Sequence, residues 1–144
     1  MKLFAGNKGK KSEKYIIYLV EDNTIYSRQL EFFIKSSFGE KVEIICFPVS
    51  ELAEDKINEG GVPNLLIMDH FLNAKYEDAD DGFNSIRRLK NRFPSIHFIL
   101  HSSMENRALS ISILEEGICT YIAKGDDGFK KIEEEIKVLI DEDL

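Results

Sequence analysis

The stretch YIIYLVEDN, residues 15–23, decides the fold of this chain. Its first six residues are aromatic, β-branched or aliphatic without polar alternation, which is typical of a strand buried on both faces of a parallel sheet. The next three, Glu21-Asp22-Asn23, are a signal for the start of a helix. A buried strand that leads directly into a helix predicts one unit of an α/β fold.

The same order of apolar run and amphipathic stretch recurs four more times. The further apolar runs lie at residues 42–47, 65–68, 96–100 and 121–123. The first expected helix stops at Gly39, the second runs from Ser50 to about Asn58, the third ends before Pro94 and the fourth stops at Gly117. The last expected helix has five apolar residues on one face: Phe129, Ile132, Ile136, Leu139 and Ile140. The polar segment 73–82 has no apolar period and is expected to be a loop. Five strand–helix units with short connections predict a doubly wound, five-stranded parallel sheet with helices on both faces.

Length and composition limit the classes of protein to which the chain can belong. The chain has 144 residues and a formal net charge of -7, which suits one acidic domain that folds without disulfides or a structural metal. The negative charge argues against nucleic-acid binding, and no apolar run is long enough to cross a membrane. Two cysteines and no signal-peptide pattern indicate a cytoplasmic protein.

The charge is unevenly distributed along the chain. Residues 1–14 hold five lysines against one glutamate and carry +4, so residues 15–144 carry −11. The first segment has little apolar content, and we expect it to be a disordered basic tail. The folded domain is therefore expected over residues 15–144.

Polar side chains follow four of the five expected strands. Glu21 and Asp22 follow the first strand, Asp69 the third, Ser102 the fourth and Lys124 the fifth. Ligands of doubly wound folds bind at the carboxyl ends of the strands, so these residues should converge there. Carboxylates ~5 Å apart repel by about 3 kcal/mol per pair at an effective dielectric near 20, so the cluster needs a cation. Oxygen ligands of this kind suit Mg²⁺ best.

These five residues, in this order, resemble the receiver domain of two-component response regulators, the CheY-like family. Asp22 and Asp69 are 47 residues apart, and Ser102 and Lys124 are 22 apart, as the family pattern requires. The resemblance covers residues 15 to about 142. It implies a (βα)5 flavodoxin-like three-layer sandwich.

The resemblance also implies a role for each residue. Asp69 would be the phosphoacceptor, taking a phosphoryl group from a phosphohistidine on a sensor histidine kinase or a histidine phosphotransfer protein. Mg²⁺ would be held by Glu21, Asp22, Asp69 and the backbone carbonyl of Phe71. Lys124 would offset charge on the phosphoryl oxygens.

Two further residues would transmit the signal. Ser102 would hydrogen-bond the phosphoryl group, and Tyr121 would rotate into the space that the strand-four loop leaves. The signal would then appear on the face built from the fourth helix, the fifth strand and the fifth helix, for a downstream protein that the sequence does not identify. The expected protein is a stand-alone receiver and not an enzyme beyond its own phosphorylation and dephosphorylation.

The sequence departs from the family pattern near the phosphoacceptor. Asn73 replaces a usual proline, the loop to Gly82 is about five residues longer than usual, and Lys124 precedes a glycine instead of a proline. At the two positions that often steer water onto the aspartyl phosphate, this chain has Phe71 and Met104. Neither side chain orients water, which leads to the hypothesis of slow dephosphorylation, to be accelerated by Phe71→Asn.

Each of these residues also has a simpler interpretation when it is taken alone. Asp22 or Asn23 could cap a helix, and Asp69 could cap a turn. Ser102 could be a loop hydroxyl, Lys124 a solvated charge and Tyr121 a core residue. The three histidines could serve only in packing: His70, His97 and His101. A pseudo-receiver that binds proteins without phosphorylation is the main alternative function. A dehalogenase-like phosphohydrolase would need a second acid where this chain has Phe71, which argues against that function. A flavin-binding module would need a phosphate-binding loop after the first strand, where Glu21-Asp22 would repel a phosphate.

Overall fold

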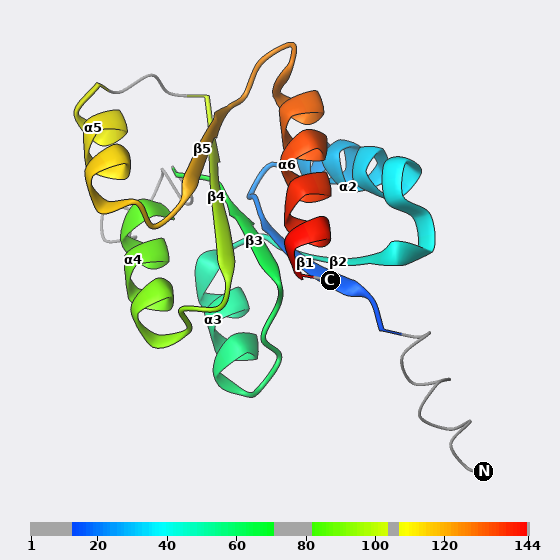
Figure 1. Cartoon of the computed structure of the whole chain (residues 1–144), viewed down its shortest axis with the longest axis horizontal. Helices are drawn as coiled ribbons and strands as arrows, with labels where there is room; N and C mark the ends of the chain where they lie inside the picture. The colour runs from blue at the N-terminus through cyan, green and yellow to red at the C-terminus, as the bar shows by residue number, and fades with distance from the viewer. Residues whose placement is uncertain (1–12, 71–81, 104–106, 144) are drawn as a thin grey trace.

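A five-stranded, all-parallel sheet with helices on both faces makes up the fold (Figure 1). The computed structural model describes residues 13–70, 82–103 and 107–143. Along the chain the elements are β1 (Tyr15–Val20), α2 (Thr24–Phe38), the 3₁₀ helix η1 (Gly39–Lys41), β2 (Val42–Phe47), α3 (Ser50–Asn58), β3 (Leu65–Met68), α4 (Gly82–Arg92), β4 (His97–Ser102), α5 (Arg107–Glu116), β5 (Thr120–Ala123) and α6 (Gly128–Asp143). The predicted α/β fold class is confirmed.

The strand order is β2-β1-β3-β4-β5, so the chain reverses its direction of winding between β1 and β3. These two strands are paired in register up to Val20 and Met68. The N–H of Asp69 donates to the carbonyl of Val20 at 3.1 Å, which holds the ends of the two strands together. The crevice at such a reversal is where doubly wound folds bind their ligands.

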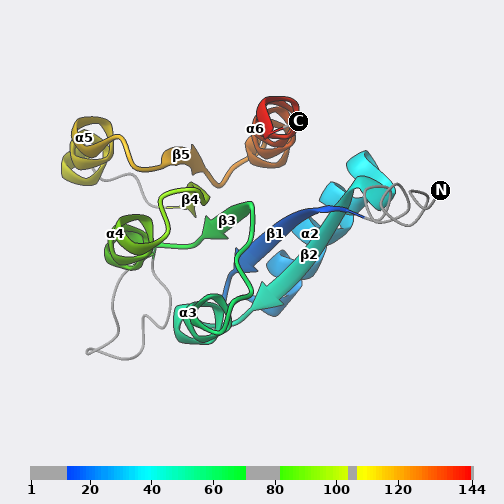
Figure 2. The same ribbon diagram turned by 60° about the horizontal axis from the view of Figure 1, so that its bottom comes forward.

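Two hydrophobic cores lie on opposite faces of the sheet. Figure 2 shows α2 and α6 on one side and α3, α4 and α5 on the other. Alternate residues of β1 enter different cores: Ile17 and Leu19 pack with α2 and α6, while Tyr18 and Val20 pack with α3, α4 and α5. All four are buried, which explains why β1 is apolar at every position.

The predicted helix signals act at the expected ends. The side chain of Asn23 accepts a hydrogen bond from the N–H of Tyr26 at 3.0 Å and caps α2. Gly39 follows α2 with a φ of 57° and Gly117 follows α5 with a φ of 62°. Both angles lie in the left-handed region that glycine adopts readily, so both residues end their helices as predicted.

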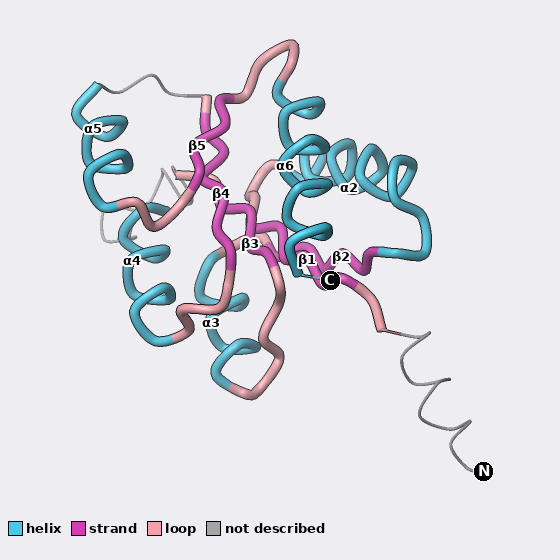
Figure 3. The backbone as a smooth tube through the Cα atoms, viewed as in Figure 1, coloured by secondary structure: helices cyan, strands magenta, loops and turns pink. Residues whose placement is uncertain are grey.

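Several element boundaries differ from the sequence prediction, as at β4 and α4 (Figure 3). Strand β4 continues to Ser102, beyond the apolar run that ends at residue 100, because Ser102 still pairs with Ala123 of β5. Gly82 begins α4 and is not a loop residue. Residues 1–12 of the predicted basic tail, the segment 73–81, Phe71 and Met104 lie outside the described residues, whereas Glu13 and Lys14 at the end of that tail are described and exposed. No helix among the described residues is long and apolar enough to cross a membrane.

Candidate functional site

Three carboxylates meet at the carboxyl ends of β1 and β3. Glu21 and Asp22 directly follow β1, and Asp69 directly follows β3. One carboxylate oxygen from each lies within 4.8 Å of the others. Glu21 and Asp69 are buried and Asp22 is exposed, so the cluster opens to solvent on the Asp22 side.

Both carboxylate oxygens of Glu21 have a partner. One accepts the backbone N–H of Asn23 at 3.1 Å, and the other accepts the ammonium of Lys124 at 2.7 Å. Burial and, to a smaller extent, the nearby charge of Asp69 nevertheless raise the pKa of Glu21 to about 7, against the lowering effect of Lys124 and Asn23. Withdrawal from water therefore outweighs the ion pair at this carboxyl.

Lys124 brings positive charge to the cluster from the end of β5. Its ammonium is 2.7 Å from Glu21 and 3.5 Å from Asp69, and its side chain is 18% exposed. Its backbone N–H donates to the carbonyl of Ser102 at 3.0 Å, which ties it to the end of β4. The structure thus brings together Glu21, Asp22, Asp69 and Lys124, as their positions after the strands predict.

Ser102 and Tyr121 lie beside this cluster on the next two strands. Ser102 is the buried last residue of β4, and Tyr121 is half-buried on β5. The hydroxyl of Tyr121 donates to the carbonyl of Ser102 at 3.3 Å. The two residues assigned to the switch are therefore in direct contact; their roles remain predictions.

The donor set fits a divalent cation. Three oxygen ligands from carboxylates suit a hard ion that retains several waters. The raised pKa of Glu21 shows that negative charge is unfavourable at this buried position, a cost that a cation would offset. Phe71, whose backbone carbonyl was assigned to the same cation, lies outside the described residues.

Two residues next to Lys124 were missed as parts of the site. The hydroxyl of Tyr26 lies 2.6 Å from Nε2 of His101, and Nδ1 of His101 lies 2.7 Å from the carbonyl of Ile122. The ammonium of Lys124 is 4.5 Å from the centroid of the Tyr26 ring. The sequence carries no signal for this pair, because the two residues are 75 positions apart.

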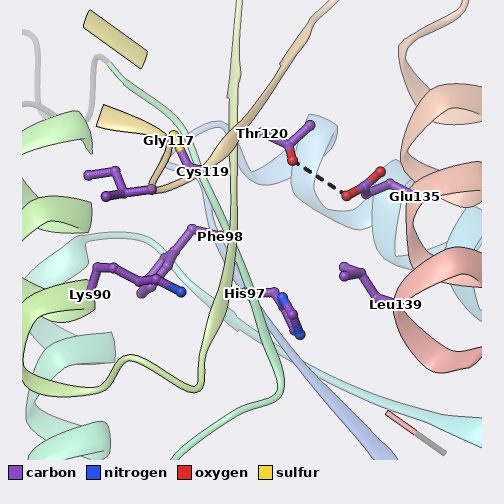
Figure 4. A pocket seen from close by; sticks show the side chains of 9 residues that line it. Lys90, His97, Phe98, Gly117, Cys119, Thr120, Glu135 and Leu139 are labelled. Carbon is purple, nitrogen blue, oxygen red and sulfur yellow. Dashed lines mark hydrogen bonds between the residues drawn. The ribbon is translucent and has the colours of Figure 1, made fainter. Parts of the chain in front are cut away.

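A pocket at the opposite end of the sheet contains none of these residues (Figure 4). It lies at the starts of β4 and β5, between α4 and α6, where the hydroxyl of Thr120 donates to Glu135 at 3.4 Å. His97 lines it and faces Asp143, 3.4 Å away. The pocket has no convergent set of carboxylates like that of Glu21, Asp22 and Asp69.

Comparison with known proteins finds similarity at the level of structure. No protein-family model and no curated protein matches the sequence. The signal receiver domain of a DNA-binding response regulator from Colwellia psychrerythraea is similar over 89% of this chain and 99% of that chain, with a TM-score of 0.75 and 21% identity.

Two other solved structures are also similar. The phosphorylated cyanobacterial phytochrome response regulator RcpA matches 89% of this chain and 95% of its own, with a TM-score of 0.75 and 18% identity. The Mn²⁺-bound form of response regulator Rcp1 matches 83% of this chain and 90% of its own, with a TM-score of 0.69 and 23% identity. This chain has the fold of response-regulator receiver domains.

Proposed function

We propose that this chain is a phosphorylatable receiver that accepts a phosphoryl group onto Asp69 from a phosphohistidine of a sensor histidine kinase or a histidine phosphotransfer protein. One observation carries the proposal: the buried carboxylate of Asp69 lies 3.5 Å from the ammonium of Lys124, beside two more carboxylates. A cation beside a buried acid cluster suits a site that holds a divalent metal ion and a phosphoryl group together.

The chemistry requires little of the protein besides position and charge. A carboxylate oxygen of Asp69 attacks the phosphorus as the P–N bond to the histidine breaks, and the leaving imidazole nitrogen keeps the bonding electron pair. The product is an aspartyl phosphate, and the neutral histidine is released. Lys124, which is already held at Asp69 and Glu21, offsets charge on the phosphoryl oxygens. The chain catalyses only this transfer and the later hydrolysis of the aspartyl phosphate, in which water takes the phosphoryl group as inorganic phosphate and the Asp69 carboxylate is restored.

The carboxylates of Glu21, Asp22 and Asp69 are the proposed ligands of Mg²⁺. A bound divalent cation supplies positive charge that offsets the charge of the phosphoryl oxygens. A similar fold is known in a Mn²⁺-bound form and another in a phosphorylated form, which supports assigning both chemistries to this site.

We place the output on the face formed by α5, β5 and α6. Ser102 and Tyr121 connect the phosphorylation site to β5 through the hydrogen bond between them. Leu114 of α5 is 83% exposed and Val138 of α6 is 50% exposed, so this face carries apolar side chains on which a downstream protein can dock.

Phosphorylation with a small donor tests the proposal directly. The full chain is incubated with Mg²⁺ and acetyl phosphate, and its intact mass is measured. We expect one phosphoryl adduct, which is absent in Asp69→Asn and absent when EDTA replaces Mg²⁺. The matched control Asp55→Asn, at an exposed carboxylate on α3, should label like the wild type.

The alternative function gives the opposite result. A pseudo-receiver binds its partner without phosphoryl transfer, so it forms no adduct under conditions in which an established receiver is labelled. That outcome would remove phosphorylation from the proposal and leave a protein-binding module of the same fold.

A further inference from the structure

The aromatic ring of Tyr26 lies against the ammonium of Lys124. Tyr26 comes from the first turn of α2, and Lys124 follows β5, so the contact joins two segments that are far apart in the chain. The ammonium is 4.5 Å from the ring centroid, within the range of a cation–π interaction. The lysine is mostly withdrawn from water, where such an interaction is stronger than on an exposed surface.

His101 fixes the position of that ring. The carbonyl of Ile122 can only accept, so Nδ1 of His101 carries the proton and donates to it at 2.7 Å. Nε2 then accepts the hydroxyl proton of Tyr26 at 2.6 Å. This arrangement needs a neutral imidazole, and burial lowers the pKa of His101. Burial likewise raises the pKa of Tyr26 to about 12, which keeps its hydroxyl protonated.

The packing around the pair leaves it little freedom. The ring of Phe129 on α6 meets the Tyr26 ring edge-on, with centroids 5.5 Å apart and an interplanar angle of 66°. Gly128 also packs against the pair: an added Cβ there would make an ordinary contact with Cε1 of His101 at 3.4 Å but would lie only 2.9 Å from the carbonyl oxygen of Ala123. The pair is therefore fixed from α2, β4, β5 and α6 at once.

We propose that Tyr26 and His101 are positioning residues that hold the ammonium of Lys124 at the carboxylates of Glu21 and Asp69. This inference rests on the proposed function for its purpose, since the positioned ammonium is the one assigned to the phosphoryl oxygens. The ring of Tyr26 restrains the ammonium by direct contact, and His101 acts through the ring by orienting its hydroxyl.

The first measurement does not depend on phosphoryl transfer. The full chain in EDTA is treated with N-hydroxysuccinimidyl acetate, and the acetylation rate of Lys124 is followed by peptide mass mapping. In Tyr26→Leu we expect this rate to rise about tenfold, because the ring contact and the hydroxyl are both lost. In Tyr26→Phe, which retains the ring, we expect a rise of about threefold.

A control on the same helix separates positioning from packing. Phe33 also contacts Phe129, with centroids 5.3 Å apart, but has no described contact with Lys124. Phe33→Leu removes a comparable aromatic contact and should leave the Lys124 acetylation rate within about twofold of wild type. Equal acceleration in Phe33→Leu and Tyr26→Leu, or no acceleration in Tyr26→Leu, would overturn the proposal.

The second measurement tests the consequence for the reaction. Labelling by acetyl phosphate with Mg²⁺ should slow about tenfold in Tyr26→Leu and about threefold in Tyr26→Phe. The variant His101→Asn retains an amide donor for Ile122, but its shorter side chain places no acceptor at the position of Nε2, where Tyr26 donates. The double variant with His101→Asn and Tyr26→Phe should be labelled no more slowly than either single variant, because both substitutions remove the same hydrogen bond, the one between Tyr26 and His101. Additive losses would contradict the coupling.

The two measurements fail separately. If the wild-type chain takes no phosphoryl group, the proposed function is wrong, while the acetylation rates still decide whether Tyr26 holds Lys124. If the wild type is labelled and Tyr26→Leu is labelled at the same rate, the proposed function stands and the positioning role is wrong.

Discussion

Glu21 is buried beside Lys124, and its pKa is nevertheless raised to about 7. Loss of hydration is the largest cause, and the charge of Asp69 acts in the same direction. The ion pair at 2.7 Å only partly compensates, because a single ammonium faces three carboxylates. Without a bound cation, the ionised form of Glu21 is therefore a source of instability in the folded protein.

This leads to a pH dependence with a definite sign. The pKa of Glu21 is 4.5 as a free group and about 7 in the fold, so the folded state binds more protons between these values. In EDTA, the free energy of unfolding should fall as the pH rises from about 4.5 to about 7, by at most roughly 3 kcal/mol. Glu21→Gln should remove this part of the slope in urea unfolding measured across that range.

An exposed glutamate provides the matched control for this measurement. Glu51→Gln, on the surface of α3, should retain the slope of the wild type. A Glu21→Gln protein whose slope equals that of the wild type would show that Glu21 does not titrate abnormally. Excess Mg²⁺ should flatten the wild-type slope, because the cation favours the ionised carboxylate.

Among the individual residues of the site, those that directly follow strands could be located from the sequence. The positions of Asp69 and Lys124 could be inferred because the carboxyl ends of parallel strands meet at one edge. Tyr26 and His101 could not, because their partnership depends on the orientation of two side chains from α2 and β4. The raised pKa of Glu21 was equally inaccessible, since it depends on how much water the fold excludes.

Helix α4 begins in close contact with the end of β3. The N–H of Gly82 donates to the carbonyl of His70 at 2.7 Å, so the chain returns directly beside Asp69. A Cβ on Gly82 would overlap the carbonyl oxygen of Asp69 and lie 2.9 Å from both Cα of His70 and Cγ of Met68. Two of these three neighbours are backbone atoms, which no change of rotamer can move.

Gly82→Ala should therefore disturb the phosphoacceptor. We expect a loss of about 1–3 kcal/mol in the free energy of unfolding, because the backbone must shift to accommodate the methyl group. Alanine favours a helix interior over glycine by about 1 kcal/mol, and this reduces the loss without reversing it. Labelling of Asp69 by acetyl phosphate should slow in the same variant, and urea unfolding gives the stability.

Gly125→Ala is the control for this substitution. No atom lies within 4 Å of a Cβ added there, although Gly125 directly follows Lys124. Gly125→Ala should change neither the free energy of unfolding nor the rate of Asp69 labelling appreciably. If Gly82→Ala were as stable and as quickly labelled as Gly125→Ala, the close approach of α4 to β3 would not matter for the site.

Element boundaries show where local sequence patterns stop being informative. Glycine in a polar stretch predicts a loop, yet Gly82 is the first residue of α4, at a place where the end of β3 leaves no room for a side chain. Strand β4 extends to Ser102 because β5 supplies a partner for it. Where the signal is local, as at the start of α2, the sequence limited the cap to Asp22 or Asn23, and the structure has Asn23.

Over the whole molecule, one sheet separates two cores. Adjacent buried residues of a central strand belong to different cores, as Leu66 and Ile67 of β3 do. The alternation of strands and helices predicted helices on both faces, but it contains nothing that sets which strand lies beside which. The order β2-β1-β3-β4-β5 depends on crossovers between segments far apart in the chain.

Because the sheet belongs to both cores, the two faces should unfold together. The chain has no tryptophan, so one introduced residue reports on one face alone. Phe38→Trp places the probe at the core under α2, and Phe93→Trp at the core under α4. In urea, both probes and far-ultraviolet circular dichroism should give one coincident transition, as expected for a domain of this size.

A conservative core substitution makes this test decisive. Ile86 is fully buried in the core under α4, and Ile86→Val should lower the free energy of unfolding by about 0.5–1.5 kcal/mol. The transition seen by the probe at residue 38, on the other face, should move by the same amount as that seen at residue 93. Ile34→Val, in the core under α2, should give the reciprocal result. If the urea transition moved only for the probe on the substituted face, each core would unfold separately. The strands common to both cores would then not couple the unfolding of one face to that of the other.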